Sequence, residues 1–249
     1  MTVREVFEFL NTLFPVGTAC DFDNVGILAG DPNAEITGAV VSLDCTPAAI
    51  QAARDNGCGL IITHHPVIFE PLKNVLAGSV AYELIKSGIS VISMHTNLDV
   101  GTGGVNDALS AALGLCEVKK VAAADGYLLN TGKLPSPLSS EAVARLIKSR
   151  LGGCVKFNKT SAPIERLLLC SGSGGGYLCE VAHHGCDALV TADIKHNVFI
   201  DAERLGITVF DAGHFNTEDV VTEPLKNLLA EHFSALRVIT CHGTSITHI

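Results

Sequence analysis

Residues 38–65 alternate between strand and helix signals, and this alternation restricts the fold more than any other feature of the sequence. GAVVSLD (38–44) has the apolar, partly β-branched composition of a buried strand. TPAAIQAARDNG (46–57) carries the signals of a helix, with Thr46 at the N-cap and a proline at the first helical position. GLIITHH (59–65) returns to the buried-strand pattern. This order is a βαβ unit, which predicts an α/β fold.

The alternation continues along the rest of the chain, with a change of character after about residue 115 and a second series of elements beyond it. LPSPLSS (134–140), with two prolines and three serines, is predicted to be a loop. The other predicted helices are 2–14, 79–87, one from about 105, 140–151, 177–184, 196–205 and 217–232, and the other predicted strands are 89–96, 154–158, 166–172, 188–193, 207–213 and 236–242.

The last helix and strand can rejoin the first part of the chain, so the predicted domains are discontinuous. We expect two α/β domains with mixed sheets flanked by helices. The first comprises residues 1–125 plus 215–249, and the second comprises residues 126–214.

Composition and charge exclude several classes of protein. Hydrophobic residues make up 47% of the chain, aromatic residues only 5%, and tryptophan is absent, so Val, Ile, Leu and Ala must fill the core. The net charge of -9, without a basic cluster, argues against a nucleic-acid partner. No segment approaches the roughly 20 apolar residues of a membrane span. The N-terminus is acidic, and the nine cysteines are scattered without CxxC spacing, so we expect a reduced, cytoplasmic protein.

Three of the predicted strands end in histidines and carboxylates, which is the most informative pattern in the sequence. In an open α/β sheet, ligands bind in the cleft beyond the carboxyl ends of the strands. Imidazole and carboxylate together are the ligands of divalent first-row metals such as Zn, Mn, Fe or Ni. We therefore expect a metal site in that cleft. The residues concerned are His64 and His65, then His95 and Asp99, and then Asp211, His214 and Glu218.

The spacing of His214 and Glu218 places them one turn apart on a helix, with Cβ atoms roughly 5–6 Å from each other. Two metals that share a bridging carboxylate lie about 3.5–4 Å apart and can generate hydroxide near neutral pH. The alternative for any single histidine is an ordinary hydrogen-bonded residue of the surface or core. The pair His64 and His65 favours the metal interpretation, because the extended residue before a proline directs neighbouring rings apart.

Four segments resemble the signature blocks of the NIF-three-like family, also labelled type-2 GTP cyclohydrolase I homologues. They occur in the family order, and the remaining chain is similar to the short form that lacks an inserted middle domain. The segments are DFDNVGILAGDP (21–32), LIITHHPVIFEPLKNV (60–75), MHTNLDVGTGGVNDALSAALGL (94–115) and TADIKHNVFIDAERLGITVFDAGHFNTE (191–218).

The resemblance implies a dinuclear centre with two divalent metal ions per chain (Zn, Mn, Fe or Ni), and a toroidal homohexamer built as a trimer of dimers. It also implies a small-molecule substrate. Asp99 and Glu218 are our candidates for bridging the metals, and His95 is the candidate for proton transfer, with hydrogen bonding to a metal ligand as its alternative. The implied metal ligands are His64, His65, Asp99, His214 and Glu218.

Other polar motifs have weaker interpretations. Asp193 and His196 are candidates for substrate binding, and their alternative is helix capping by Asp193 with His196 exposed. SGSGGG (171–176) lacks the spacing of a nucleotide-binding motif, so a tight connection is the favoured interpretation and an anion cradle the alternative. His183 and His184, at the end of a predicted helix, are not expected to be ligands.

Two functions from different classes follow from these observations. The first is a metal-dependent hydrolase, GTP cyclohydrolase-like by family label, that acts on a small molecule such as one that resembles a nucleotide. The second is a metal-binding hexameric assembly or chaperone-type protein without turnover. No segment of the sequence identifies guanine as the substrate.

Overall fold

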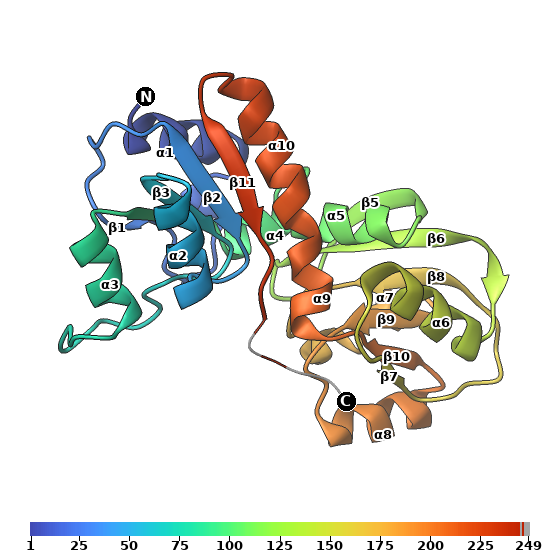
Figure 1. Ribbon diagram of the computed structural model, residues 1–249. Helices are drawn as coiled ribbons and strands as arrows, with labels where there is room; N and C mark the ends of the chain where they lie inside the picture. Colours follow the sequence, from blue (N-terminus) through green and yellow to red (C-terminus); the bar gives the residue numbers. More distant parts are fainter. Residues whose placement is uncertain (245, 247–249) are drawn as a thin grey trace. The chain divides into compact units, whose positions relative to one another are not determined.

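The computed structural model describes residues 1–244 and 246, and its strands form two separate mixed sheets (Figure 1). One unit contains Met1–Gly104 together with the later segment, from Val221, that carries α10 and β11, and the other contains Val105–Val220. Both sheets are flanked by helices, as the sequence predicted for an α/β protein.

The first unit has a five-stranded sheet in the order β1-β4-β3-β2-β11. The strands β2, β3, β4 and β11 are parallel, and β1 is antiparallel to β4. Its strands are β1 (Gly26–Ala29), β2 (Gly38–Ser42), β3 (Leu60–Thr63), β4 (Ser90–Ser93) and β11 (Arg237–Cys241). Its helices are α1 (Val3–Leu13), η1 (Val16–Thr18), α2 (Pro47–Asp55), α3 (Val80–Ser87), α4 (Thr96–Val100) and α10 (Thr222–His232).

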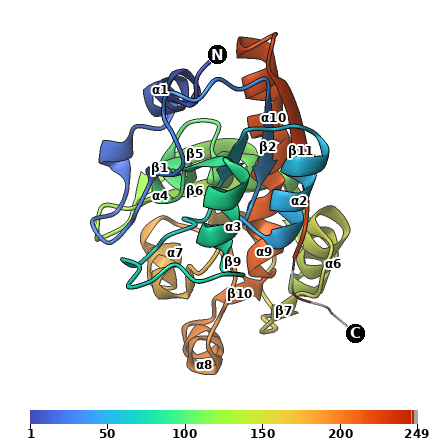
Figure 2. The same ribbon diagram turned by 60° about the vertical axis from the view of Figure 1, so that its left-hand side comes forward.

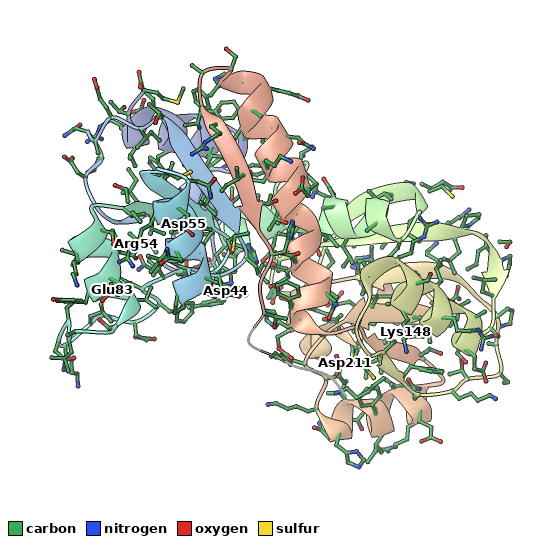
Figure 3. All side chains as sticks on the ribbon, in the orientation of Figure 1. Asp44, Arg54, Asp55, Glu83, Lys148 and Asp211 are labelled. Atoms are coloured by element: carbon green, nitrogen blue, oxygen red, sulfur yellow. The ribbon has the colours of Figure 1, made fainter. Side chains whose placement is uncertain are left out.

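Apolar faces of α2 and α3 cover the first sheet (Figure 2). Ile50 of α2 and Leu84 of α3 belong to one buried cluster with Ile61 of β3. The two helices are also joined at the surface, where Arg54 Nη2 lies 2.8 Å from Glu83 Oε2 (Figure 3). An exposed pair of this kind contributes little to stability, so the buried cluster holds the helices on the sheet.

The second unit has a six-stranded sheet in the order β5-β6-β8-β9-β10-β7, in which β8, β9 and β10 are parallel. Its strands are β5 (Cys116–Ala122), β6 (Leu128–Leu138), β7 (Lys156–Phe157), β8 (Ile164–Leu169), β9 (Ala188–Thr191) and β10 (Thr208–Asp211). Its helices are α5 (Val105–Ala112), α6 (Ser140–Leu151), η2 (Gly175–Tyr177), α7 (Glu180–His183), α8 (His196–Leu205) and α9 (His214–Glu218), and the turn η3 (Asp219–Val221) follows.

Alternate residues of the second sheet face two different buried clusters. Leu167 of β8 packs with side chains of α5 and α6, and its neighbour Leu168 packs with side chains of α7 and α8. This is the period of two that a strand imposes on its side chains. The second sheet is therefore covered by helices on both faces.

The unit boundaries differ from the predicted domain limits of 125 and 214. The division falls at 104/105, because Leu109 and Leu113, on and just after α5, are buried with the β8, β9 and β10 side chains of the second unit. At the other end it falls at 220/221, because α9 contacts α5. The chain then returns to the first sheet, where β11 pairs in parallel with β2.

The prediction of a loop at LPSPLSS was wrong. β6 extends to Leu138, which pairs with Ile164, and the register between Lys133 and Leu138 is irregular. The two prolines lie inside this irregular stretch, where a missing backbone N–H breaks no regular ladder. The strand β1 and the short helix α4 were not predicted either.

Candidate functional site

Three imidazoles of the first unit follow the ends of two neighbouring parallel strands. His64 and His65 come directly after β3, and His95 comes two residues after β4. The strands end in register, with Thr63 opposite Ser93 and their hydroxyl oxygens 2.8 Å apart. The ring centroid of His64 lies 5.0 Å from those of His65 and His95, and the three residues offer ligand atoms within 4.8 Å of one another. The first unit therefore holds the imidazole cluster that the sequence predicted.

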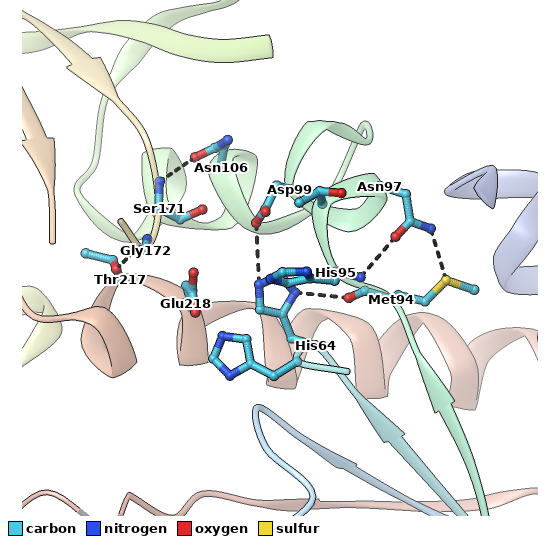
Figure 4. A network of polar contacts seen from close by, with 12 residues as sticks. His64, Met94, His95, Asn97, Asp99, Asn106, Ser171, Gly172, Thr217 and Glu218 are labelled. Carbon is cyan, nitrogen blue, oxygen red and sulfur yellow. Dashed lines mark hydrogen bonds and ion pairs between the residues drawn. The ribbon is translucent and has the colours of Figure 1, made fainter. Parts of the chain in front are cut away.

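Each of these rings is fixed through its Nδ1 atom. His64 Nδ1 lies 3.0 Å from the carbonyl oxygen of Met94 (Figure 4), and His95 Nδ1 lies 2.8 Å from Asp23 Oδ1. His65 Nδ1 lies 2.7 Å from a carboxylate oxygen, that of Asp44. Carbonyl and carboxylate oxygens only accept, so Nδ1 carries the hydrogen in all three rings. This makes Nε2 the atom that can coordinate a metal.

Asp99 adds a carboxylate to the same cluster. Helix α4 starts directly after His95, and Asp99 N donates to His95 O at 3.0 Å, which closes one helical turn. The Asp99 side chain is buried, and its Oδ1 lies 3.6 Å from His64 Nε2. A buried carboxylate beside the Nε2 of an anchored imidazole is a donor set suited to a divalent cation.

The second unit presents an imidazole and a carboxylate on one short helix. His214 and Glu218 are the first and last residues of α9, and His214 Nε2 lies 3.0 Å from Glu218 Oε2. His214 Nδ1 lies 2.6 Å from Asp193 Oδ2, so this ring is anchored like the other three. The hydrogen bond with Glu218 raises the pKa of His214 to about 9 despite burial, and Asp193 adds to the increase.

Gly172 leaves room beside these two side chains. Its φ is +61°, and a Cβ built there would lie 2.1 Å from Glu218 Oε1 and 3.3 Å from His214 Nε2. Only glycine fits this position without displacing the carboxylate. Glycine at this position therefore lets the Glu218 carboxylate lie close against the backbone beside His214 Nε2.

Backbone amides of the glycine-rich segment 171–176 donate to neighbouring side chains. Gly172 N donates to Thr217 Oγ1 and Ser171 N donates to Asn106 Oδ1 (Figure 4), and Gly174 N donates to Thr191 Oγ1. Three of its amides are therefore engaged by side chains, which agrees with the interpretation as a tight connection.

The two candidates for substrate binding have different surroundings. The Asp193 carboxylate holds His214, whereas His196 is exposed at the first residue of α8. Asp193 does not cap α8, whose N-cap is Lys195 and has no side-chain cap hydrogen bond. Asp193 adopts a positive φ of 51°, a backbone conformation that few non-glycine residues adopt. Roles for both residues in substrate binding stay predictions.

Sequence reasoning missed several contributors. Asp23 and Asp44 were not among the predicted site residues, but the side chain of Asp23 is inaccessible to solvent and holds His95, and Asp44 holds His65. Asp211, which the sequence placed with the expected metal ligands, lies at the end of β10 with its Oδ2 2.8 Å from Lys156, and it belongs to none of the donor clusters of the described residues. A further donor cluster was not expected to bind metal at all, and it comprises Glu180, His183 and His184, with ligand atoms within 4.8 Å of one another.

Two helix-flanked mixed sheets with anchored histidines and carboxylates after their parallel strands define an α/β protein with candidate metal-binding clusters. The chain belongs to the Duf34/NIF3 (NGG1p interacting factor 3) family, whose model matches residues 1–245. The family resemblance found in the sequence is thereby confirmed.

Relatives and solved structures agree with this assignment. A Clostridium perfringens protein described as a GTP cyclohydrolase 1 type 2 homolog is 30% identical over 230 residues, covering 88% of this chain and 87% of the relative. A Staphylococcus aureus homolog aligns over 350 residues with 26% identity, covering 96% of this chain and 95% of the relative, so it has additional residues that the shorter chain lacks. The crystal structure of S. aureus protein SA1388 matches with a TM-score of 0.91 and 27% identity, covering 100% of this chain and 99% of that one. Within the described residues, none of the helices has the length and apolar character needed to traverse a bilayer.

Proposed function

We propose that the chain is a divalent-metal-dependent hydrolase that binds two ions per chain and acts on a small, nucleotide-like molecule. The proposal is supported chiefly by one repeated arrangement. Four histidines, from both units, have Nδ1 on an oxygen acceptor at 2.6–3.0 Å, which leaves Nε2 as the atom that can coordinate a metal, in His214 once a metal displaces the Nε2 proton. Histidines that bind metals have this arrangement, because the acceptor fixes the tautomer and raises the basicity of the ring.

The proposed ligands are the anchored histidines and their neighbouring carboxylates. In the first unit they are His64, His65 and Asp99, and in the second they are His214 and Glu218. Bound divalent ions would polarise a substrate oxygen and lower the pKa of a water molecule. His95 is proposed to carry a proton at Nε2, since its Nδ1 is engaged by Asp23.

The class of substrate comes from the relatives. Their description as GTP cyclohydrolase 1 type 2 homologs favours a purine nucleotide and hydrolysis at the ring. The second candidate function is a homohexameric, metal-binding assembly without turnover. Metal binding by the same donor sets supports this function as well as it supports a hydrolase. Hydrolysis of nucleotides or phosphoesters by the metal-loaded protein distinguishes the two.

Metal content per chain tests the proposal directly. We expect about two ions in the wild-type protein and one or fewer in His65→Ala and in Glu218→Ala, because each change removes a coordinating atom. His232→Ala is the matched control, since it removes an exposed imidazole that belongs to none of the donor clusters of the described residues. Unchanged stoichiometry in His65→Ala and Glu218→Ala would remove the proposed site. Loss of both ions in each variant would support the prediction that the five ligands serve one dinuclear centre.

A further inference from the structure

Two phenylalanines of the first unit lie at the surface, unlike the other phenylalanines of the described chain. Phe22 is 68% exposed and Phe69 is 45% exposed, whereas the other phenylalanines of the described chain are buried or half-buried. Their ring centroids lie 6.4 Å apart. Exposed aromatic side chains that lie together are a feature of binding surfaces rather than of ordinary protein surface.

Hydrogen bonds hold the backbone beside both rings. Asn24 Nδ2 donates to Ile68 O at 2.6 Å, which joins the segment of Phe22 to the segment of Phe69. Asp23, next to Phe22, accepts hydrogen bonds from the backbone N–H and the hydroxyl of Thr96. The two rings are therefore displayed on a fixed frame.

The rings continue directly into the imidazole cluster. Phe69 lies 6.3 Å from His95 between ring centroids, with the planes at 83°, and His95 lies 5.7 Å from His65. Apolar aromatic faces beside a few convergent polar groups are the composition of a small-molecule site. A surface for another protein chain does not need this continuity with anchored imidazoles.

We propose that Phe22 and Phe69 bind the flat heteroaromatic ring of the substrate, of the size of a nucleobase, and so place the remainder of the molecule at the imidazole cluster. This inference rests on the proposed function and specifies its substrate class. Every base has a π-face, so aromatic contacts of this kind recognise the ring without selecting one base. Compounds that have the same sugar and phosphate but no ring are then poor ligands.

Equilibrium binding of matched small molecules tests the inference. The probes are GMP and AMP, with ribose 5-phosphate as the probe that lacks the ring. For the metal-loaded wild-type protein we expect the nucleotides to bind about 5- to 30-fold more tightly than ribose 5-phosphate. Equal affinity for GMP, AMP and ribose 5-phosphate would overturn the inference.

Substitutions that keep the residues apolar isolate the contribution of the aromatic faces. Phe22→Leu and Phe69→Leu are expected to weaken nucleotide binding about 5-fold or more each, with ribose 5-phosphate unchanged, and Phe69→Trp is expected to restore it. Leu76→Ala is the control, since Leu76 is 65% exposed a few residues after Phe69 but has no ring. Nucleotide affinity that is unchanged in both Phe→Leu variants would overturn the inference.

Two further measurements on the same samples separate the possible failures. Metal content reports on the proposed function, and repeating the binding with chelator-treated protein reports on the rings alone. The wild-type protein could lack metal and still prefer nucleotides, with this preference absent in Phe69→Leu. That result supports the inference although the proposed function fails. If Phe22→Leu and Phe69→Leu lower the molecular mass in solution and leave nucleotide affinity intact, the rings contact a second copy and the inference is overturned.

Discussion

At the scale of single residues, Asp23 links stability to the orientation of His95. Burial raises the pKa of this carboxyl, but hydrogen bonds from His95 and Thr96 outweigh it and lower the pKa to about 2. A depressed pKa in the folded state stabilises the protein above the unfolded pKa, and this stability is lost as the pH falls through about 2. We expect Asp23→Asn to lower the free energy of unfolding at pH 7 by roughly 1.5–3 kcal/mol.

Denaturant unfolding of the wild type and Asp23→Asn at several pH values checks this prediction. The difference between them is expected to be constant from pH 7 to about 5 and to shrink from about pH 4 downward. Asp55→Asn is the control, because Asp55 is an exposed carboxylate on α2 (Figure 3) and such changes are usually within about 0.5 kcal/mol. A difference that does not depend on pH would contradict the role of charge at Asp23.

Gly172 provides the second test at this scale. A methyl group there collides with Glu218 Oε1 and forces a side chain into a positive φ, so we expect Gly172→Ala to cost roughly 1–3 kcal/mol and to reduce metal content. Gly176→Ala is the matched control in the same segment, because nothing lies within 4 Å of the position that its methyl group would take. Thermal unfolding and elemental analysis are the measurements. Equal behaviour of the two variants would show that Gly172 does not shape the donor pair.

The sequence identified metal-ligand candidates better than the residues that hold them. His64, His65 and His95 were predicted because they follow apolar strands, and parallel neighbours end at one edge of a sheet. Asp23 was missed because it is 72 residues away from His95, in a loop with no periodic pattern. Such pairings depend on tertiary structure, which local signals do not encode.

At the scale of elements, two of the helices were predicted to the residue. The predicted ranges 140–151 and 196–205 are those of α6 and α8, and both helices are followed by a glycine. β6 was missed in part, because two prolines and three serines are typical of loops and an irregular register accommodates them. Local chemistry thus predicts where a helix ends more reliably than whether an irregular strand continues.

The capping box of α1 gives a prediction for an element. Thr2 Oγ1 accepts from Glu5 N at 3.3 Å, and Glu5 Oε2 accepts from Thr2 N at 2.6 Å. Thr2→Ala removes one of these bonds, and we expect it to lower the free energy of unfolding by about 1 kcal/mol. Chemical denaturation measures this loss, with Thr12→Ala at the exposed end of the same helix as the control. A larger loss in Thr12→Ala would argue against the box as the dominant contribution.

At the scale of the whole molecule, the strands of the second sheet come from one continuous segment and those of the first sheet do not. Residues 105–220 contain every strand of the six-stranded sheet and the helices on both its faces. The first sheet needs β11 from the end of the chain, and β11 covers the edge of β2, whose five residues are all buried. We therefore expect a fragment of residues 105–220 to fold alone and a fragment of residues 1–104 to aggregate.

Both expectations follow from what each fragment leaves exposed. Residues 1–104 without α10 and β11 present an apolar, unpaired strand edge, which is a template for pairing between chains. Circular dichroism and sedimentation of the two fragments measure the outcome. In a permuted chain, the segment that starts at residue 221 is joined through a linker to residue 1, which restores β11 to the first fragment. We expect this permuted chain to be soluble and to unfold cooperatively. A soluble, cooperatively folded fragment of residues 1–104 would show that β11 is dispensable for the first sheet.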